Sequence, residues 1–229
     1  MPKNKFQRWA VIVIVAVLSI SLIGTSFVAI FRPDDGQTAT DTEAIQQEYE
    51  QRKQITEVLS QKVEENPEDL EAKIALGDAY YSKAAVSIQI NVQEYQQDLQ
   101  TAIDLYQQVL AQKQDNEVLL KLANSAFLAG NKEVAEESYT ELLKREPENI
   151  DALYGYGMYL FYDKEDPKQA AANWQKALGL TSDENYKKIL EEMIDIAQSI
   201  TLDNAEGQAE AEQKQEQDSS EQGKSSEQE

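Results

Sequence analysis

The sequence contains no cysteine and no histidine among its 229 residues. Without cysteine, the chain cannot form a disulfide, a thiolate zinc site or a cysteine nucleophile. Without histidine, it also lacks the usual general base of enzymes and the commonest nitrogen ligand of metal ions. Neither a Ser-His-Asp nor a Cys-His triad can be assembled from this composition. We therefore expect a protein that is not an enzyme and that binds no metal and no other cofactor.

Positive charge is also scarce. The chain has 21 Lys and Arg residues against 42 Asp and Glu residues, which gives a formal net charge of −21. A chain of this charge is repelled by the phosphates of nucleic acid, so the composition argues against nucleic acid as a partner.

The stretch 117–147 predicts two short helices joined by a turn. Gly130 and Asn131 form the turn, since both residue types tolerate the left-handed backbone angles that end helices, and Pro147 ends the second helix. The apolar residues before and after that turn are spaced as one face of a helix: Leu119, Leu122, Ala123 and Ala126, then Val134, Ala135, Tyr139, Leu142 and Leu143. Neither helix alone can bury its apolar face, so stacked neighbouring units are required.

The same spacing recurs on both sides of this stretch. The bulky residues Tyr106, Tyr139 and Trp174 follow one another at intervals of 33 and 35 residues. Each is preceded by a small residue four positions earlier: Ala102, Ala135 and Ala170. Small residues allow two helices to approach closely, and the large ring fills the space beside them.

With Leu76-Gly77 and Tyr80 in its first helix, and with Pro67 and Pro147 between units, this pattern resembles the tetratricopeptide repeat family, whose period is about 34 residues. The resemblance covers 67–182, as three helical hairpins at about 67–114, 115–148 and 149–182. It departs from the family in about 13 extra residues after Tyr80. The expected fold class is all-α: an N-terminal transmembrane helix, then an α-solenoid of about three such hairpins and a C-terminal capping helix.

The extra residues after Tyr80 have two interpretations. Either both helices of the first repeat are longer by about two turns, or a disordered loop projects from the repeat. The insertion contains neither Gly nor Pro and carries several apolar residues. We therefore favour the longer helices.

The resemblance also implies a partner-binding surface. In the family, the first helix of each repeat lines a concave groove that binds a protein or peptide. The corresponding residues here are Asp78, Tyr81, Asn124, Phe127, Tyr154, Met158 and Tyr162. The alternative is that most of these aromatic residues pack between repeats. Certain family members hold a peptide carboxylate with Lys and Asn, but only Asn124 matches here, so we expect aromatic contacts and amide hydrogen bonds to an extended or helical segment.

The N-terminal residues predict a membrane anchor. A basic segment, 1–9, precedes 22 residues without charge, Ala10 to Phe31. As a helix this run is about 33 Å long, enough to cross a bilayer core of about 30 Å. The positive-inside bias places the N-terminus in the cytoplasm and the repeats outside it. A cleaved signal peptide, which would release a soluble secreted protein, is the alternative.

The remaining segments connect or cover the repeats. Residues 32–41 predict a linker, and 42–66 a long helix that caps the first repeat, with either Asp41 or Thr42 as its N-cap. Its apolar face is expected to include Ile45, Tyr49, Ile55, Leu59 and Val63. Residues 183–202 predict a C-terminal capping helix that begins at Ser182 or Asp183, and 203–229 an acidic disordered tail.

Together these features favour a single-pass membrane protein of bacterial type that binds another protein or peptide at the cell envelope. Tethering would raise the effective concentration of a weakly binding partner. A platform built by self-association, with this chain as a homo-oligomer, is the structural alternative.

Overall fold

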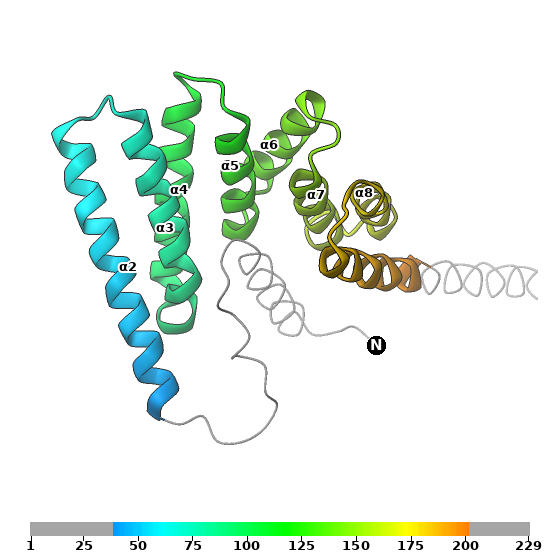
Figure 1. The fold of residues 1–229 in the computed structure, drawn as a ribbon, viewed down its shortest axis with the longest axis horizontal. Helices are drawn as coiled ribbons and strands as arrows, with labels where there is room; N and C mark the ends of the chain where they lie inside the picture. The colour runs from blue at the N-terminus through cyan, green and yellow to red at the C-terminus, as the bar shows by residue number, and fades with distance from the viewer. Residues whose placement is uncertain (1–38, 202–229) are drawn as a thin grey trace, which may run out of the picture. The chain divides into compact units, whose positions relative to one another are not determined.

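A computed structural model describes residues 39–201, and every regular element within them is an α-helix (Figure 1). The all-helical prediction is thus confirmed for this part of the chain. The predicted basic segment 1–9, membrane anchor 10–31 and acidic tail 203–229 lie outside the described residues. Among the helices of 39–201, none combines the length and the apolar character that a bilayer span requires.

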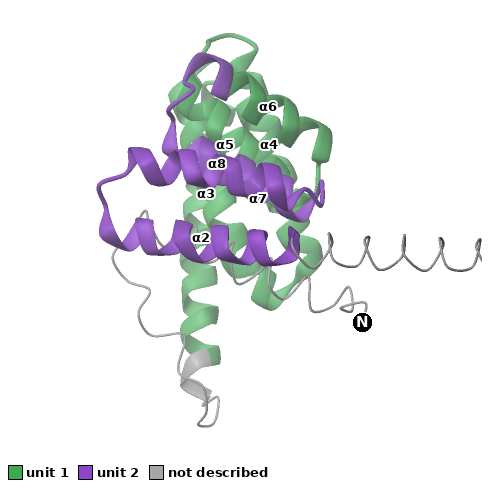
Figure 2. Ribbon diagram, turned by 90° about the vertical axis from the view of Figure 1, so that its right-hand side faces the viewer, with its two compact units in different colours: residues 1–142 green, residues 143–229 purple. Residues whose placement is uncertain are grey.

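The chain divides into two compact units between Leu142 and Leu143, a point within α6 (Figure 2). Unit 1 contains α2 (Ala39–Glu65), α3 (Leu70–Ile90), α4 (Val92–Leu110), α5 (Asn116–Ala129) and most of α6 (Lys132–Arg145). Unit 2 contains α7 (Ile150–Tyr162), α8 (Pro167–Leu180) and a further helix over 184–201.

Residues at the helix ends explain why the chain turns where it does. Gly130 ends α5 with a φ of 75°, the left-handed conformation that glycine adopts without steric cost. The side chains of Asp115 and Asn149 accept backbone hydrogen bonds from the first turns of α5 and α7. Asp183 accepts from the amides of residues 185 and 186 at 2.8 and 3.0 Å and so begins the last helix. The predicted turn at Gly130 is confirmed, and of the two predicted caps, Ser182 and Asp183, the structure uses Asp183.

The inserted residues of the first repeat are helical. Helices α3 and α4 have 21 and 19 residues, whereas α5 and α6 have 14 each. A single residue, Asn91, separates α3 from α4: its amide donates to Ser87 O at 2.7 Å, and its Oδ1 accepts from Gln93 N at 3.0 Å. The interpretation as two longer helices is confirmed.

Helix α2 runs along the lengthened α3 (Figure 1), with a contact face different from the predicted one. Thr56 is buried, and Nη1 of Arg52 donates to the Ser82 carbonyl at 3.0 Å. Ile55, predicted to lie on the buried face, is 52% exposed, and this prediction is wrong. The spacing explains the error, because 45, 49, 52, 56, 59 and 63 form one helical face that includes the polar Arg52 and Thr56. Asp41 and Thr42 were also wrong as N-caps, since both lie inside α2.

The recurrent aromatic residues form the core of their hairpins. Tyr106, Tyr139 and Trp174 are at most 1% exposed. The three small residues that precede them, Ala102, Ala135 and Ala170, are fully buried. This is the packing that the repeated spacing predicts.

The helix over 184–201 packs in unit 2 through its predicted apolar face. The ring centroid of Tyr186 lies 5.8 Å from that of Tyr154 on α7. Five residues of this face are buried: Tyr186, Leu190, Met193, Ile194 and Ala197. The helix therefore covers apolar surface at the end of the repeats, as predicted.

Candidate partner-binding face

The buried aromatic residues of the first two repeats hold polar side chains of the facing helix. The hydroxyl of Tyr106 on α4 donates to Oδ1 of Asp78 on α3 at 2.7 Å. The hydroxyl of Tyr139 on α6 donates to Oδ1 of Asn124 on α5 at 2.6 Å. Asp78 and Asn124 occupy the same place in their repeats, directly after Gly77 and Ala123. The two hydrogen bonds therefore fix equivalent side chains in the first helix of each hairpin.

The buried aromatic residue donates its hydrogen bond to a backbone carbonyl, instead of to a side chain, in the third repeat. Its equivalent residue is Met158, which has no strong acceptor, and Nε1 of Trp174 donates instead to the Tyr154 carbonyl at 3.1 Å. Gly157 makes this possible, because a Cβ there would lie 2.7 Å from Cδ1 of Trp174 and still closer to Nε1. Gly77 has the same role in the first repeat, where a Cβ would lie 2.6 Å from Cε1 of Tyr106.

An ion pair connects the first helices of repeats one and two. Nζ of Lys121 on α5 lies 2.8 Å from Oδ2 of Asp78 and 3.0 Å from Oε1 of Glu117. Burial alone would lower the pKa of Lys121, but the hydrogen bonds to both carboxylates raise it above its ordinary value. The side chains of Lys121 and Asp78 are 27% and 43% exposed, so a ligand at this surface can reach both.

The seven residues predicted to line the groove are divided between the units. Asp78, Tyr81, Asn124 and Phe127 belong to unit 1, where all four are partly exposed. Tyr154, Met158 and Tyr162 belong to unit 2. Tyr154 and Met158 are only 8% and 3% exposed, whereas Tyr162 is partly exposed. The accessible members are therefore four residues of unit 1 and Tyr162 of unit 2.

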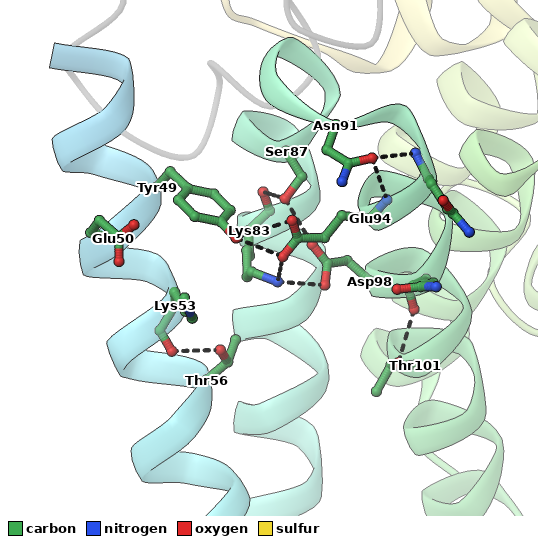
Figure 3. A network of polar contacts seen from close by, with 12 residues as sticks. Tyr49, Glu50, Lys53, Thr56, Lys83, Ser87, Asn91, Glu94, Asp98 and Thr101 are labelled. Atoms are coloured by element: carbon green, nitrogen blue, oxygen red, sulfur yellow. Dashed lines mark hydrogen bonds and ion pairs between the residues drawn. The ribbon is translucent and has the colours of Figure 1, made fainter. Parts of the chain in front are cut away.

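A second polar cluster lies between α2, α3 and α4 and was not predicted (Figure 3). Nζ of Lys83 lies 2.6 Å from Oε1 of Glu94 and 2.8 Å from Oδ1 of Asp98. Ser87 donates to Oδ2 of Asp98 at 2.8 Å, and Tyr49 on α2 donates to Glu94 at 2.8 Å. The cluster thus joins three helices through one buried lysine.

Burial and charge act in opposite directions within this cluster. Burial raises the pKa of Asp98, although the hydrogen bond from Lys83 partly offsets the rise. At the less buried Glu94, the hydrogen bond from Lys83 lowers the pKa. Burial would lower the pKa of Lys83, but its two carboxylate partners raise it above the ordinary value. The lysine therefore remains charged and neutralises one of its two partners.

An open pocket of about 410 Å³ lies beside this cluster. Its lining is mostly polar: Tyr80, Lys83, Asn91, Gln93, Glu94, Gln97, Asp98 and Thr101. Lys83 already contacts two carboxylates there, and within 39–201 no cluster of three or more acidic side chains is placed to hold a metal ion. The arrangement is that of a structural ion pair that fixes the positions of three helices.

Comparison with known proteins agrees with the repeat geometry. Residues 120–185 match the family model described as the tetratricopeptide repeat. The matched region contains most of the second hairpin and the whole of the third. No curated protein matches the chain.

Proposed function

We propose that this chain, whose residues 120–185 match the tetratricopeptide repeat family model, is a membrane-tethered scaffold which binds a peptide segment of another protein. Repeats of this family commonly serve as non-catalytic interaction surfaces, and we propose no catalytic step for this protein. The binding surface is assigned to the partly exposed residues of α3 and α5, the first helices of the first two repeats: Asp78, Tyr81, Lys121, Asn124 and Phe127, together called the unit 1 face.

The observation that carries this proposal is the hydrogen bond from Tyr139 to Asn124. Because the phenol hydroxyl occupies Oδ1 of Asn124, the amide NH₂ group is left to donate to a peptide carbonyl. The bond also limits the rotation of the amide, which reduces the entropy lost when a ligand binds. Nearby on α3, Asp78 is held in the same way by Tyr106.

The unit 1 face suits a peptide with both polar and apolar groups. Phe127 supplies aromatic surface together with the exposed part of Tyr81, which otherwise packs against Ala84, Tyr95 and Leu99. The Asp78–Lys121 pair supplies one charge of each sign. A carboxylate clamp of two positive or amide groups is not proposed, since Asp78 stands where an amide would be needed. We therefore propose a neutral extended or helical segment as the ligand.

Membrane tethering rests on the uncharged run from Ala10 to Phe31. The basic residues before it favour a cytoplasmic N-terminus and an extracytoplasmic repeat domain. A tethered scaffold retains a partner at the envelope even when the intrinsic affinity is modest.

Site-specific photo-crosslinking in cells tests the binding surface. A benzophenone amino acid replaces Phe127, and a matched chain carries it at Gln107, an exposed position of α4 outside the unit 1 face. We expect a discrete protein adduct from position 127 that is lost in the Lys121→Ala/Asn124→Ala variant. Equal adducts from positions 127 and 107 would reject the unit 1 face.

The tether needs its own measurement. Full-length protein should remain in the membrane after an alkaline carbonate wash, and its intact mass should include residues 1–31. Release by carbonate together with loss of these residues would establish the cleaved, secreted form instead.

Self-association is the second candidate function, and one observation favours it. Ile55 and Val58 are 52% and 65% exposed on α2, three residues apart on one helical face. Two such faces could pair and bury apolar surface. Light scattering of detergent-solubilised protein should then give a dimer that Ile55→Glu/Val58→Glu converts to a monomer. A monomer at every concentration removes this candidate.

A further inference from the structure

The turn between α3 and α4 presents apolar side chains to solvent. Ile90 and Val92 are 43% and 61% exposed on either side of Asn91. They belong to an uncharged run, residues 84–93, in a chain of which 28% is charged. The turn is well ordered by the two hydrogen bonds to Oδ1 of Asn91, at 3.0 and 3.3 Å. These apolar groups are thus displayed by a fixed structure, which is called the α3–α4 tip, residues 88–92.

The tip projects beyond the neighbouring repeat. Tyr95, in the first turn of α4, donates to the Leu128 carbonyl at 3.1 Å, and α5 ends one residue later at Ala129. The residues before Tyr95 therefore extend past the end of α5. The insertion in the first repeat produces this projection, since α3 is seven residues longer than α5.

The tip lies at the same end of unit 1 as the start of α2 (Figure 1). Tyr49 on α2 and Lys83 on α3 both contact Glu94, so these residues lie at one level. At 1.5 Å per residue, Ala39 is about 15 Å from Tyr49, and Ile90 is about 10 Å from Lys83. Because α2 and α3 are antiparallel, Ala39 and Ile90 both lie on the same side of this level, toward the same end of unit 1.

The chain that precedes α2 is short. Only residues 32–38 separate the uncharged run that ends at Phe31 from the first residue of α2. Seven residues span at most about 25 Å when fully extended. A bilayer that holds 10–31 is therefore within reach of the tip.

We infer that the α3–α4 tip docks on the bilayer surface, where Ile90 and Val92 enter the interfacial region and orient the repeats. The inference rests on the proposed membrane tether and adds a second, reversible contact to it. Glu94, two residues after Val92, is paired with Lys83 at 2.6 Å, which offsets the negative charge that follows the tip in the sequence. Two side chains bind a bilayer weakly by themselves, but the tether supplies a high effective concentration. The expected surface is neutral phosphatidylcholine, because the chain as a whole is strongly acidic.

Lipid-borne quenching tests this contact on the full chain in phosphatidylcholine vesicles. The absence of natural cysteine allows one fluorescent label at Gln89→Cys beside the tip, and a matched label at Gln112→Cys after α4. Spin-labelled lipid should quench the first label at least about twofold more than the second, as expected for a group at the interface. Ile90→Glu/Val92→Glu should remove the difference while the helical circular dichroism stays unchanged.

The outcomes separate the two proposals. Failure of the full chain to float with the vesicles would reject the tether, and the tip contact with it. Flotation with equal quenching of both labels would reject the tip contact alone. In detergent without lipid, the label at Gln89→Cys should stay exposed to solvent at every protein concentration. If it becomes shielded as the protein concentration rises, the tip contacts a second copy of the chain, and the inference is overturned.

Discussion

Tyr106 and Asp78 form a hydrogen bond of 2.7 Å across the first hairpin, and it connects the core to the proposed binding face. The ring of Tyr106 is 1% exposed, whereas the side chain of Asp78 is 43% exposed. One bond thus links a residue that stabilises the fold to one that a ligand can reach. The same arrangement recurs in Tyr139 and Asn124. Substitutions of the aromatic residues should therefore affect both stability and binding.

Tyr106→Phe keeps the buried ring and removes the hydroxyl. A hydrogen bond to a charged acceptor contributes about 1.5–3 kcal/mol, so we expect the free energy of unfolding to fall by about that amount. Urea denaturation followed by circular dichroism measures it. In an Asp78→Ala background the same substitution should cost clearly less, and equal costs in both backgrounds would show that the two residues are not coupled.

Gly157→Ala should destabilise unit 2, because the added Cβ would overlap the Trp174 ring. Overpacking of this kind costs about 1–3 kcal/mol. Gly179→Ala on α8 is the matched control, since a Cβ there meets no atom within 4 Å. The control should be more stable by up to about 1 kcal/mol through its higher helix propensity. Thermal melting of both variants tests the pair, and a loss of stability in Gly179→Ala would contradict the explanation.

Two fully buried serines should respond in opposite directions to replacement by alanine. Oγ of Ser125 has no hydrogen-bond partner, whereas Ser87 donates to Asp98 at 2.8 Å. Ser125→Ala removes an unsatisfied hydroxyl and should be neutral or stabilising by about 1 kcal/mol. Ser87→Ala leaves a buried carboxylate oxygen without its donor and should cost about 1–3 kcal/mol. The midpoints of denaturant unfolding, compared between variants with the same m-value, measure the two effects. A similar loss of stability from both substitutions would refute the explanation.

The two lysine ion pairs should differ strongly in energy. Lys83→Met leaves Asp98, which is 3% exposed, without its positive partner and should cost about 3–5 kcal/mol. Lys121→Met breaks a pair that water reaches and should cost at most about 1 kcal/mol. Chemical denaturation measures both. Asp98→Asn should recover part of the loss in the Lys83→Met background, and no recovery would mean that the unpaired charge is not the cause.

The protein should unfold in alkali. Burial raises the pKa of Tyr95 to about 12, and burial together with Asp78 raises that of Tyr106 further. The pKa values of Lys83 and Lys121 are raised as well, as described above. In each case the folded state keeps a proton that the unfolded chain loses, so stability is complete below about pH 10 and decreases as the pH rises above it. The absorbance of ionised tyrosine should report Tyr95 and Tyr106 only together with the loss of helical circular dichroism; complete ionisation of the tyrosines with the helices intact would contradict this.

The sequence by itself determined the repeat. The intervals between Tyr106, Tyr139 and Trp174, the small residues before them and Gly130 in its turn are local signals, and each recurs where the period requires it. Helical periodicity depends on neighbours three and four positions away, so these features can be read along one chain. The longer helices of the first repeat followed from the same pattern, since no Gly or Pro interrupts the insertion.

Only the tertiary structure decided which side chains meet. Lys83 and Asp98 are brought together by the one-residue turn at Asn91, and Tyr49 joins them from a helix 45 residues before Glu94. In the same way, Arg52 and Thr56 rather than Ile55 face α3, and Tyr154 and Met158 lie in the interior of unit 2. The physical reason is that an amphipathic pattern gives the direction of a helical face, whereas the rotation and register of that face against its neighbour depend on contacts between distant residues.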